Sequence, residues 1–317
     1  MKRFSEIKLL KNLKKVCLVA HRNPDADAIA SMLVFKNFLL EKFRIKTVDV
    51  FADCEKFPRE CLYFASENEI NPRMDEYDAV VMMDCPNATE ERLGKYLPLF
   101  LNTEIKICID HHSTNLNLGR LNYVEKISST CEIVFNILEE FNYNFTKQDL
   151  IKIYSGIITD TNNFSVGEFG KRSFEIASVC AGEIDTIDVY LNFFSNNTLK
   201  NMQVLAKSIE NIKNFKNNQI IISHISKVEA KKFNINQQDY IGIINRLKTI
   251  ANSKFVCFIY PKDNGYYVSL RADKHHNVAV IAQKYGGGGH VGASAFMSFN
   301  DISTIEKIII EEFSAQL

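Results

Sequence analysis

The sequence lacks several features that would place a protein in a special class. Its 38 basic and 38 acidic residues cancel, which excludes a uniformly basic binder of nucleic acid. It has no low-complexity segment, no apolar run as long as a membrane span, and no apolar signal core in its first residues. No C-x-x-C pair occurs among its eight cysteines, which predicts buried, reduced thiols. These absences indicate a globular cytoplasmic protein without a membrane partner.

Length and charge distribution indicate two domains. A chain of 317 residues is long enough for two domains or one large one. Residues 1–194 hold 23 Lys and Arg against 29 Asp and Glu, a net charge of −6, whereas residues 195–317 hold 15 against 9, a net charge of +6. This asymmetry suggests a cation site in the first part and an anion-binding surface in the second, with chance variation of surface charge as the alternative.

Three apolar runs in the first part end in acidic or imidazole side chains. Residues 16–20 lead into His21-Arg-Asn-Pro-Asp25-Ala-Asp27, residues 79–83 into Asp84, and residues 105–109 into Asp110-His111-His112. Together with a run at residues 45–51 and helical apolar spacing in between, they predict an α/β fold with a mostly parallel, doubly wound sheet. Ligands of such sheets bind beyond the carboxyl ends of the strands, so we expect these side chains to form one site.

Two capping boxes predict helix starts further along. Ser129-Thr-Cys-Glu132 and Thr146-Lys-Gln-Asp149 each precede a helical apolar pattern. The second of these helices runs to Thr159-Asp160-Thr161, so it adds the carboxylate of Asp160 to the candidate site.

The remaining residues predict a smaller C-terminal α/β domain. Strands are expected near residues 219–223, 255–260 and 266–271, and the Asp263-Asn-Gly265 turn makes the last two a hairpin. A helix, the run Gly286-Gly-Gly-Gly289-His290, a strand near residues 295–299 and a closing helix follow. We therefore assign residues 1–186 to a first domain, 187–215 to a helical linker and 216–317 to a second domain.

The candidate residues of the first domain have the ligand types of a divalent metal centre. Clustered carboxylates would repel one another and suffer raised pKa values, whereas two divalent cations would balance four ionised aspartates. Mixed imidazole and carboxylate ligands suit Mn²⁺, and also Zn²⁺ or Fe²⁺, whereas Mg²⁺ prefers oxygen ligands alone. Such a centre clamps a phosphoryl group and generates hydroxide from a bridging water. For each residue taken alone, a cap or a strand end is the simpler interpretation.

The glycine run and Arg271 point to phosphate binding in the second domain. Four consecutive glycines allow positive φ and a close approach of the backbone to a ligand, with amides free to bind an anion. Arg271 can bind phosphate through two parallel hydrogen bonds, and His290 adds a donor. A flexible turn is the alternative, although four glycines are entropically costly for a turn.

In order and context, these motifs resemble those of the DHH phosphoesterase superfamily, and Arg271 with the glycine run resembles its DHH-associated C-terminal domain. The two-domain length is similar to the oligoribonuclease and pAp-phosphatase (nanoRNase) branch. The resemblance implies that His21, Asp25 and Asp84 hold one metal, and that Asp27, Asp84, His111 and Asp160 hold the other. It implies that Asp110 orients a ligand and that His112 contacts the scissile phosphate, which makes Asp84, Asp110 and His112 the catalytic set. It further implies that substrate is bound in a cleft between the domains by His112, Arg271, Gly287, Gly288, Gly289 and His290.

Two segments depart from the family pattern. The glycine run continues as Val291-Gly-Ala-Ser-Ala-Phe296, with Ser294-Ala295 where Ala-Gly is common. Asn162-Asn163-Phe164 follows Asp160-Thr161 where the family usually has a glycine. The first departure bears on base preference and the second on the shape of the loop.

We therefore expect a phosphoesterase with two divalent metal ions, manganese above all, that releases nucleoside monophosphates from RNA of two to five nucleotides, or AMP from pAp. Partners are short single strands or nucleotides rather than long duplexes, since no long basic groove is evident. One alternative is a phosphodiesterase for linear dinucleotides such as pApA, and inorganic pyrophosphatase is less favoured. From another class, the alternative is a nucleotide- or RNA-binding module with a structural metal. Monomer and homodimer both stay open.

Overall fold

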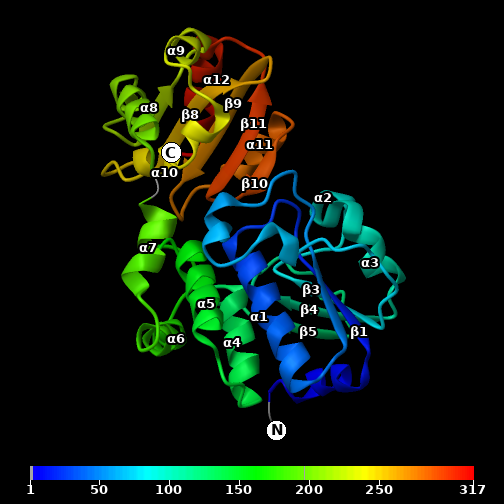
Figure 1. Cartoon of the computed structure of the whole chain (residues 1–317). Helices are drawn as coiled ribbons and strands as arrows, with labels where there is room; N and C mark the ends of the chain where they lie inside the picture. The colour runs from blue at the N-terminus through cyan, green and yellow to red at the C-terminus, as the bar shows by residue number, and fades with distance from the viewer. Residues whose placement is uncertain (1–2, 196) are drawn as a thin grey trace. The chain divides into compact units, whose positions relative to one another are not determined.

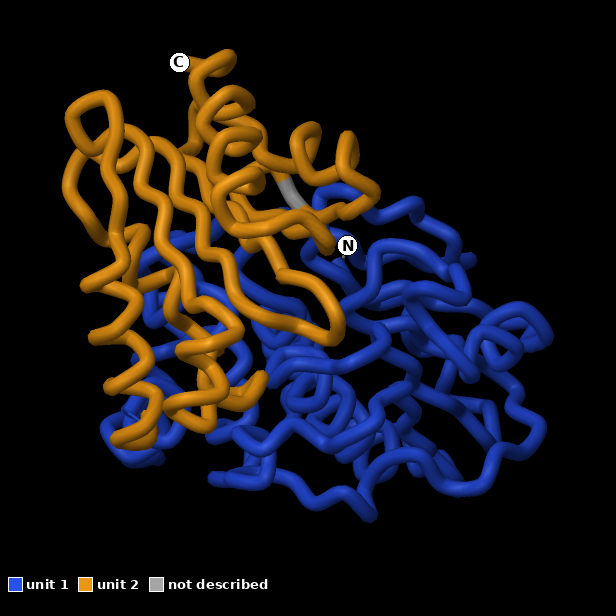
Figure 2. The backbone as a smooth tube through the Cα atoms, turned by 90° about the horizontal axis from the view of Figure 1, so that it is seen from above, with its two compact units in different colours: residues 1–196 blue, residues 197–317 orange. Residues whose placement is uncertain are grey.

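The computed structural model describes residues 3–195 and 197–317 (Figure 1). The chain divides into two compact units, Met1–Asn196 and Asn197–Leu317, each built on its own sheet (Figure 2). The finer division into two domains with a linker at residues 187–215 stays a prediction. None of the helices in the described part of the chain is long and apolar enough to cross a membrane.

The first unit contains a five-stranded sheet in which every neighbouring pair is parallel, in the order β2-β1-β3-β4-β5. Its strands are β1 (Lys15–Val19), β2 (Thr47–Phe51), β3 (Ala79–Met83), β4 (Ile105–Asp110) and β5 (Leu121–Val124). The four strands that the apolar runs predict are confirmed. The edge strand β5 is missed by sequence reasoning, because its half-buried residues form no continuous apolar run.

Helices cover both faces of this sheet, which explains the unbroken apolar runs. In β1, Val16 and Leu18 face one apolar layer, whereas Cys17 and Val19 face the other. Helices α1 (Ala26–Lys42), α4 (Thr130–Glu140) and α5 (Lys147–Asp160) supply the first layer, and α2 (Glu90–Leu93) and α3 (Leu97–Asn102) supply the second (Figure 1). Helices α6 (Lys171–Ala181) and α7 (Thr186–Phe194) pack beside α5. The predicted doubly wound architecture is confirmed.

One of the two predicted capping boxes forms completely. Thr146 Oγ1 accepts a hydrogen bond from the amide of Asp149, and the Asp149 carboxylate accepts one from the amide of Thr146. At α4, Ser129 Oγ accepts from the amide of Glu132, as expected. The Glu132 carboxylate instead accepts hydrogen bonds from the hydroxyls of Ser128 and Ser173, so the second half of this predicted box is wrong. A short 3₁₀ helix lies at Arg59–Tyr63.

The second unit contains a mixed sheet in the order β10-β11-β9-β8-β7-β6. Its strands are β6 (Lys213–Phe215), β7 (Ile220–His224), β8 (Phe255–Lys262), β9 (Gly265–Ala272), β10 (Gly288–His290) and β11 (Ala293–Ser298). Its helices are α8 (Leu199–Glu210), α9 (Lys227–Lys232), α10 (Ile243–Leu247), α11 (Ala279–Lys284) and α12 (Ile302–Ser314). The predicted hairpin is confirmed, with Lys262 paired to Gly265. The smaller C-terminal α/β domain is confirmed as well.

The strand order of the first unit places the candidate residues at one edge. Strand β1 lies between β2 and β3, so the chain reverses its direction of travel across the sheet at β1. In parallel sheets, ligands bind where loops leave the carboxyl ends of the two strands at such a switch point, here β1 and β3. His21 follows β1 and Asp84 follows β3, which brings two segments far apart in sequence to the same place.

Candidate metal centre

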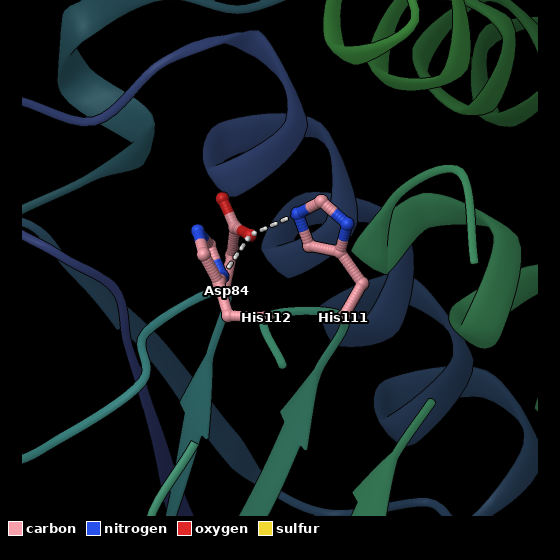
Figure 3. Close-up of side chains that lie close together, drawn as sticks. All are labelled: Asp84, His111 and His112. Carbon is pink, nitrogen blue, oxygen red and sulfur yellow. Dashed lines mark ion pairs between the residues drawn. The ribbon is translucent and has the colours of Figure 1, made fainter. Parts of the chain in front are cut away.

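Asp84 lies at the centre of the candidate site. It directly follows β3, is 2% exposed, and adopts a left-handed backbone conformation with φ of 50°. This conformation costs a residue with a side chain about 1 kcal/mol, and functional residues often bear such a cost. One carboxylate oxygen lies 3.5 Å from His111 Nε2 and 3.8 Å from His112 Nδ1 (Figure 3). The other lies 3.6 Å from His21 Nε2.

The other predicted metal ligands gather around Asp84. Ligand atoms within 4.8 Å of one another form three overlapping groups, which are His21 with Asp25 and Asp84, Asp27 with His111 and Asp160, and Asp84 with His111 and His112. The structure therefore brings together all six residues that the sequence predicts as ligands, from four separate segments. Asp84 belongs to two groups, and its two carboxylate oxygens can each bind a different cation.

Backbone carbonyls orient two of the histidines. His21 Nδ1 lies 2.9 Å from the carbonyl oxygen of Arg22, and His111 Nδ1 lies 3.2 Å from that of Ile127. In each ring Nδ1 therefore donates, which leaves the Nε2 lone pair directed at the carboxylates. Metal-binding histidines are commonly oriented by such a second hydrogen bond.

Asp110 lies behind the site rather than in it. Its side chain is fully buried; one oxygen lies 2.7 Å from His112 Nδ1, and the other accepts a hydrogen bond of 2.6 Å from Asn115 Nδ2. With both oxygens occupied, Asp110 holds the His112 ring so that Nε2 is its available nitrogen. Asn115 is a supporting residue that sequence reasoning missed, since a lone asparagine in a loop carries no distinctive signal.

The start of α4 holds Asp27. The amides of Thr130 and Cys131 donate hydrogen bonds of 2.7 and 2.9 Å to the two carboxylate oxygens of Asp27, which is fully buried. A helix N-terminus favours a negative charge, so α4 stabilises the ionised carboxylate. Sequence reasoning found the cap at Ser129 but not its partner, because Asp27 is separated from Thr130 by 103 residues.

Electrostatics of the site fit divalent cations. Although burial favours neutral rings, the neighbouring carboxylates raise the pKa of His21 to about 9 and that of His111 to about 10. Burial and the repulsion of nearby carboxylates raise the pKa of Asp27 and of Asp160. The carboxylates of the site thus favour positive charge at the Nε2 positions. A donor set of carboxylates and imidazoles that needs this much positive charge fits one or two divalent metal ions.

Comparison with known protein families agrees with this geometry. The model described as DHH family, N-terminal domain, matches residues 15–159, and the DHHA1 domain matches residues 201–315. The chain belongs to the DHH family of phosphoesterases. All the candidate metal ligands but Asp160 lie within the first match, and Asp160 directly follows it.

Relatives of this DHH protein span almost its whole length. The Streptococcus mutans protein named "Probable bifunctional oligoribonuclease and PAP phosphatase NrnA" is 26% identical over 293 residues, which cover 92% of this chain and 92% of the relative. The Thermus thermophilus protein named "Bifunctional oligoribonuclease and PAP phosphatase NrnA" is 23% identical over 95% of this chain and 90% of its own. An exopolyphosphatase-related protein from Bacteroides fragilis has the same fold, with a TM-score of 0.89, 24% identity and coverage of 98% of this chain and 95% of that one.

The DHHA1 domain places three of the six predicted substrate residues around one cavity. Arg271 on β9 and Gly288 and Gly289 on β10 line a cavity of about 390 Å³. The side chain of His290 lies outside the described part of the structure, so its role in substrate binding stays a prediction. Gly287 is not among the cavity residues, and a Cβ there would lie 2.1 Å from the carbonyl oxygen of Ala295. Close pairing of β10 with β11 therefore explains this glycine without a ligand.

Both departures from the family pattern have a local structural explanation. Asn162, Asn163 and Phe164 all adopt positive φ, between 45° and 58°, so they form the left-handed turn for which a glycine is the usual choice. The Ser294 hydroxyl donates a hydrogen bond of 2.7 Å to the carbonyl oxygen of Val278. It is thereby engaged in anchoring the start of α11.

Proposed function

We propose that this DHH protein hydrolyses RNA of two to five nucleotides to nucleoside monophosphates, and pAp to AMP, with two divalent metal ions that are most simply manganese. Support comes from the shared position of Asp84, which belongs to two ligand groups that meet at one buried carboxylate. The names of the relatives support the substrate class, because both relatives are called oligoribonuclease and PAP phosphatase.

The first proposed ligand set is one of the observed groups, and the second adds Asp84 to another. His21, Asp25 and Asp84 would hold one cation, and Asp27, Asp84, His111 and Asp160 would hold the other. When bound, two such cations neutralise the phosphate, align it and make water a good nucleophile near neutral pH. The α4 amides keep Asp27 in place, and the carbonyls of Arg22 and Ile127 keep Nε2 of the two histidines directed at the ligand position.

His112 has a separate role in this proposal. Its Nδ1 is bound to Asp110, so Nε2 is the nitrogen that can contact a phosphate oxygen or give a proton to the leaving oxygen. The ring is partly exposed, as a group that contacts substrate must be. Asp110 acts through His112 by fixing the ring, in the way a buried carboxylate orients a catalytic histidine.

The DHHA1 domain would bind the rest of the substrate. Arg271, the glycine backbone of β10 and His290 are proposed to hold a phosphate group of the nucleotide. Arg271 is suited to this because its Nε and Nη1 are held by Asn245 and by the carbonyl oxygen of Leu270, so the guanidinium plane is oriented before substrate binds.

A substrate panel tests the proposal. With Mn²⁺ present, pAp, pApA, RNA of two to ten nucleotides and pyrophosphate are compared by initial rates. We expect fast release of nucleoside monophosphate from the shortest RNAs and of AMP from pAp, with rates falling as RNA length rises. Preference for pApA above all other substrates would favour the linear-dinucleotide alternative. Metal binding without hydrolysis of any substrate would favour a binding module with a structural metal.

A matched pair of variants distinguishes the loss of a proposed metal ligand from the loss of one negative charge elsewhere on the protein. Asp84→Asn keeps the shape of the residue and its tolerance of the left-handed conformation but removes the negative charge. We expect hydrolysis to fall by at least about 1,000-fold, since a metal-linking carboxylate is lost. Glu183→Gln removes the same charge at an exposed position away from the candidate ligands and should leave the rate unchanged. Equal rates for wild type and Asp84→Asn would contradict the proposal.

A further inference from the structure

Three loops of the first unit meet around Asp53, which follows β2. The amide of Asn23, in the loop after β1, donates a hydrogen bond of 2.7 Å to the carbonyl oxygen of Asp53. The amide of Lys95, in the segment after β3, donates one of 3.4 Å to the Asp53 carboxylate. These loops all leave the carboxyl ends of parallel strands, so they lie at the same edge of the sheet as the candidate metal ligands.

The carboxylate of Asp53 is held firmly at this meeting point. Gly94 has φ of 53°, and a Cβ at this position would overlap Oδ2 and Cγ of Asp53, so only glycine leaves room for the carboxylate. Asn23 also adopts a left-handed conformation, with φ of 53°. The Asp53 side chain is 17% exposed. Strained backbone of this kind tends to occur at functional sites.

Two cations share this one carboxylate. Arg22 Nε lies 3.6 Å from one oxygen of Asp53, and Lys95 Nζ lies 3.7 Å from the other. Within the described residues, no second carboxylate lies within 4.0 Å of either cation. The side chains of Arg22 and Lys95 are 50% and 58% exposed. The group therefore carries one positive charge more than Asp53 balances, and that charge is accessible to a ligand.

The geometry leaves donors for a second anion. Both distances to Asp53 are longer than a hydrogen bond, so the carboxylate orients the cations without using up their donors. It faces Nε of Arg22, and Nη1 and Nη2 have no hydrogen-bond partner in the described part of the chain. A guanidinium offers five N–H donors in a plane, which suits the oxygens of a phosphate. Exposed ion pairs alone contribute little to stability.

The cations lie beside the candidate metal centre. Arg22 directly follows His21, and its carbonyl oxygen lies 2.9 Å from His21 Nδ1. Strand β1 lies between β2, which leads to Asp53, and β3, which leads to Asp84. Because neighbouring strands are about 4.8 Å apart, the ends of β2 and β3 are separated by about 10 Å. A strand of RNA with one phosphate at Asp84 can therefore reach Arg22 with its next phosphate.

We propose that Arg22 and Lys95 bind the phosphodiester next to the scissile one in RNA of three or more nucleotides. The inference rests on the proposed function and adds a phosphate site in the first unit, separate from Arg271. Proteins that bind single strands without sequence preference follow the backbone with cations. Residues 1–194 carry a net charge of −6, so one cationic site in an otherwise acidic unit suits a strand of a few nucleotides.

The test compares 5′-phosphorylated RNAs of two, three and four nucleotides. The full chain, with Ca²⁺ in place of Mn²⁺, is titrated with each RNA by fluorescence anisotropy of a 3′ label, and chromatography verifies that the RNA is intact. Wild type should bind the trinucleotide about 3- to 10-fold more tightly than the dinucleotide, as expected of two partly exposed cations. The fourth nucleotide should add much less, because its phosphodiester lies beyond Arg22 and Lys95.

Removal of both cations should remove this gain. The double variant Arg22→Ala, Lys95→Ala should bind the two RNAs with nearly equal affinity, whereas Arg22→Lys, which keeps the charge, should retain most of the gain. Salt dependence gives a second measurement. In wild type, the slope of log affinity against log salt should be steeper for the trinucleotide by about 0.7, and the double variant should lose this difference. Loss of a merely structural ion pair would not change it.

Lys46→Ala is the matched control. Lys46 is an exposed cation directly before β2, at the opposite end of this strand from Asp53, so its loss should leave the gain intact. Arg271→Ala should weaken both RNAs by the same factor. Melting curves show whether each variant is folded. If the folded double variant keeps the wild-type ratio of affinities, or if Arg271→Ala abolishes that ratio, the inference is wrong.

The outcome is distinguishable from failure of the proposed function, because binding is measured without hydrolysis. If no RNA is hydrolysed with Mn²⁺ but the gain depends on Arg22 and Lys95, the phosphate site stands and the hydrolytic proposal fails. If short RNA is hydrolysed but the trinucleotide shows no gain, or a gain independent of these cations, the hydrolytic proposal stands and the phosphate site fails.

Discussion

The hydroxyl of Thr130 donates a hydrogen bond of 3.0 Å to Asp84 Oδ1, while the amide of the same residue donates one of 2.7 Å to Asp27 Oδ2. One residue at the start of α4 thereby holds two of the proposed ligands. Thr130 is fully buried, so no water competes for these bonds. The position of the helix is thus directly coupled to the geometry of the candidate metal centre.

Thr130→Val tests this coupling, because valine keeps the shape of threonine and removes the hydroxyl. We expect the affinity for Mn²⁺ to fall by about 10-fold or more, as is typical when a group that orients a ligand is lost. Calorimetric titration with Mn²⁺ measures the effect. Thr130→Ser keeps the hydroxyl and should restore most of the affinity; if Val and Ser variants bind Mn²⁺ equally, the hydroxyl has no positioning role.

Gly156→Ala tests the close packing of α5 behind Asp27. A Cβ at this position would lie 2.4 Å from Cys131 Sγ and 2.6 Å from Asp27 Oδ1, so either α5 or the ligand must shift. We expect a loss of about 1–3 kcal/mol in the free energy of unfolding and weaker Mn²⁺ binding. Urea unfolding measures the first and titration the second.

Gly182→Ala is the control for Gly156→Ala. Its φ is −69° and the nearest atom to an added Cβ is 3.4 Å away, so alanine fits without strain. This variant should be as stable as wild type, or slightly more stable, because alanine restricts the unfolded chain. A stable Gly156→Ala protein with normal Mn²⁺ affinity would show that the contact is easily relieved.

Metal addition should stabilise the first unit. Bound cations would balance the charge of the clustered carboxylates, and a ligand at 100 times its Kd adds about 2.7 kcal/mol to the free energy of unfolding. Mn²⁺ should therefore raise the melting temperature of wild type, and EDTA should reverse the change. Asp84→Asn should lose most of the shift, whereas Glu183→Gln should keep it. An unchanged melting temperature of wild type at saturating Mn²⁺ would argue against a metal centre.

Arg271→Ala tests phosphate binding by the DHHA1 domain. The loss of a charged hydrogen-bond donor should raise KM for short RNA and pAp by about 10- to 100-fold, with a smaller change in kcat. Arg271→Lys keeps the charge but not the paired donors, so its KM should lie between that of wild type and that of Arg271→Ala. Steady-state kinetics with Mn²⁺ provide the measurement, and an unchanged KM in Arg271→Ala would remove Arg271 from substrate binding.

The stability of the second unit should depend on pH through Glu229, which caps α9. Burial acts against the charge, but hydrogen bonds from Asn211 and from Ser226 outweigh it and lower the pKa of Glu229 to about 2. Because the folded pKa is below the unfolded value, this stabilisation is fully present above about pH 4.5 and is lost as pH falls toward 2. We expect Glu229→Gln to cost about 1–3 kcal/mol at pH 6 and much less at pH 3. Urea unfolding at both values measures this, and a cost independent of pH would mean that shape rather than charge is responsible.

The sequence by itself located four of the five strands of the first-unit sheet and the six candidate ligands that gather around Asp84. Strands that are buried on both faces appear in the sequence as unbroken apolar runs. This is why β1, β3 and β4 can be located without a structure. Because parallel strands place their carboxyl ends at one edge, the residues that follow these runs had to meet. The cap at Thr146 was equally readable, since both of its partners lie within four residues.

Only the tertiary structure decided how the site is supported. The hold of α4 on Asp27 spans 103 residues, and the ion pair of Arg22 with Asp53 joins loops that follow two different strands. Glu132 matches a local capping pattern, yet its carboxylate turns to Ser173, 41 residues away. Local sequence patterns reflect interactions between residues that are close together in the chain. Contacts between distant segments follow from packing, which sets where each side chain finds its partner.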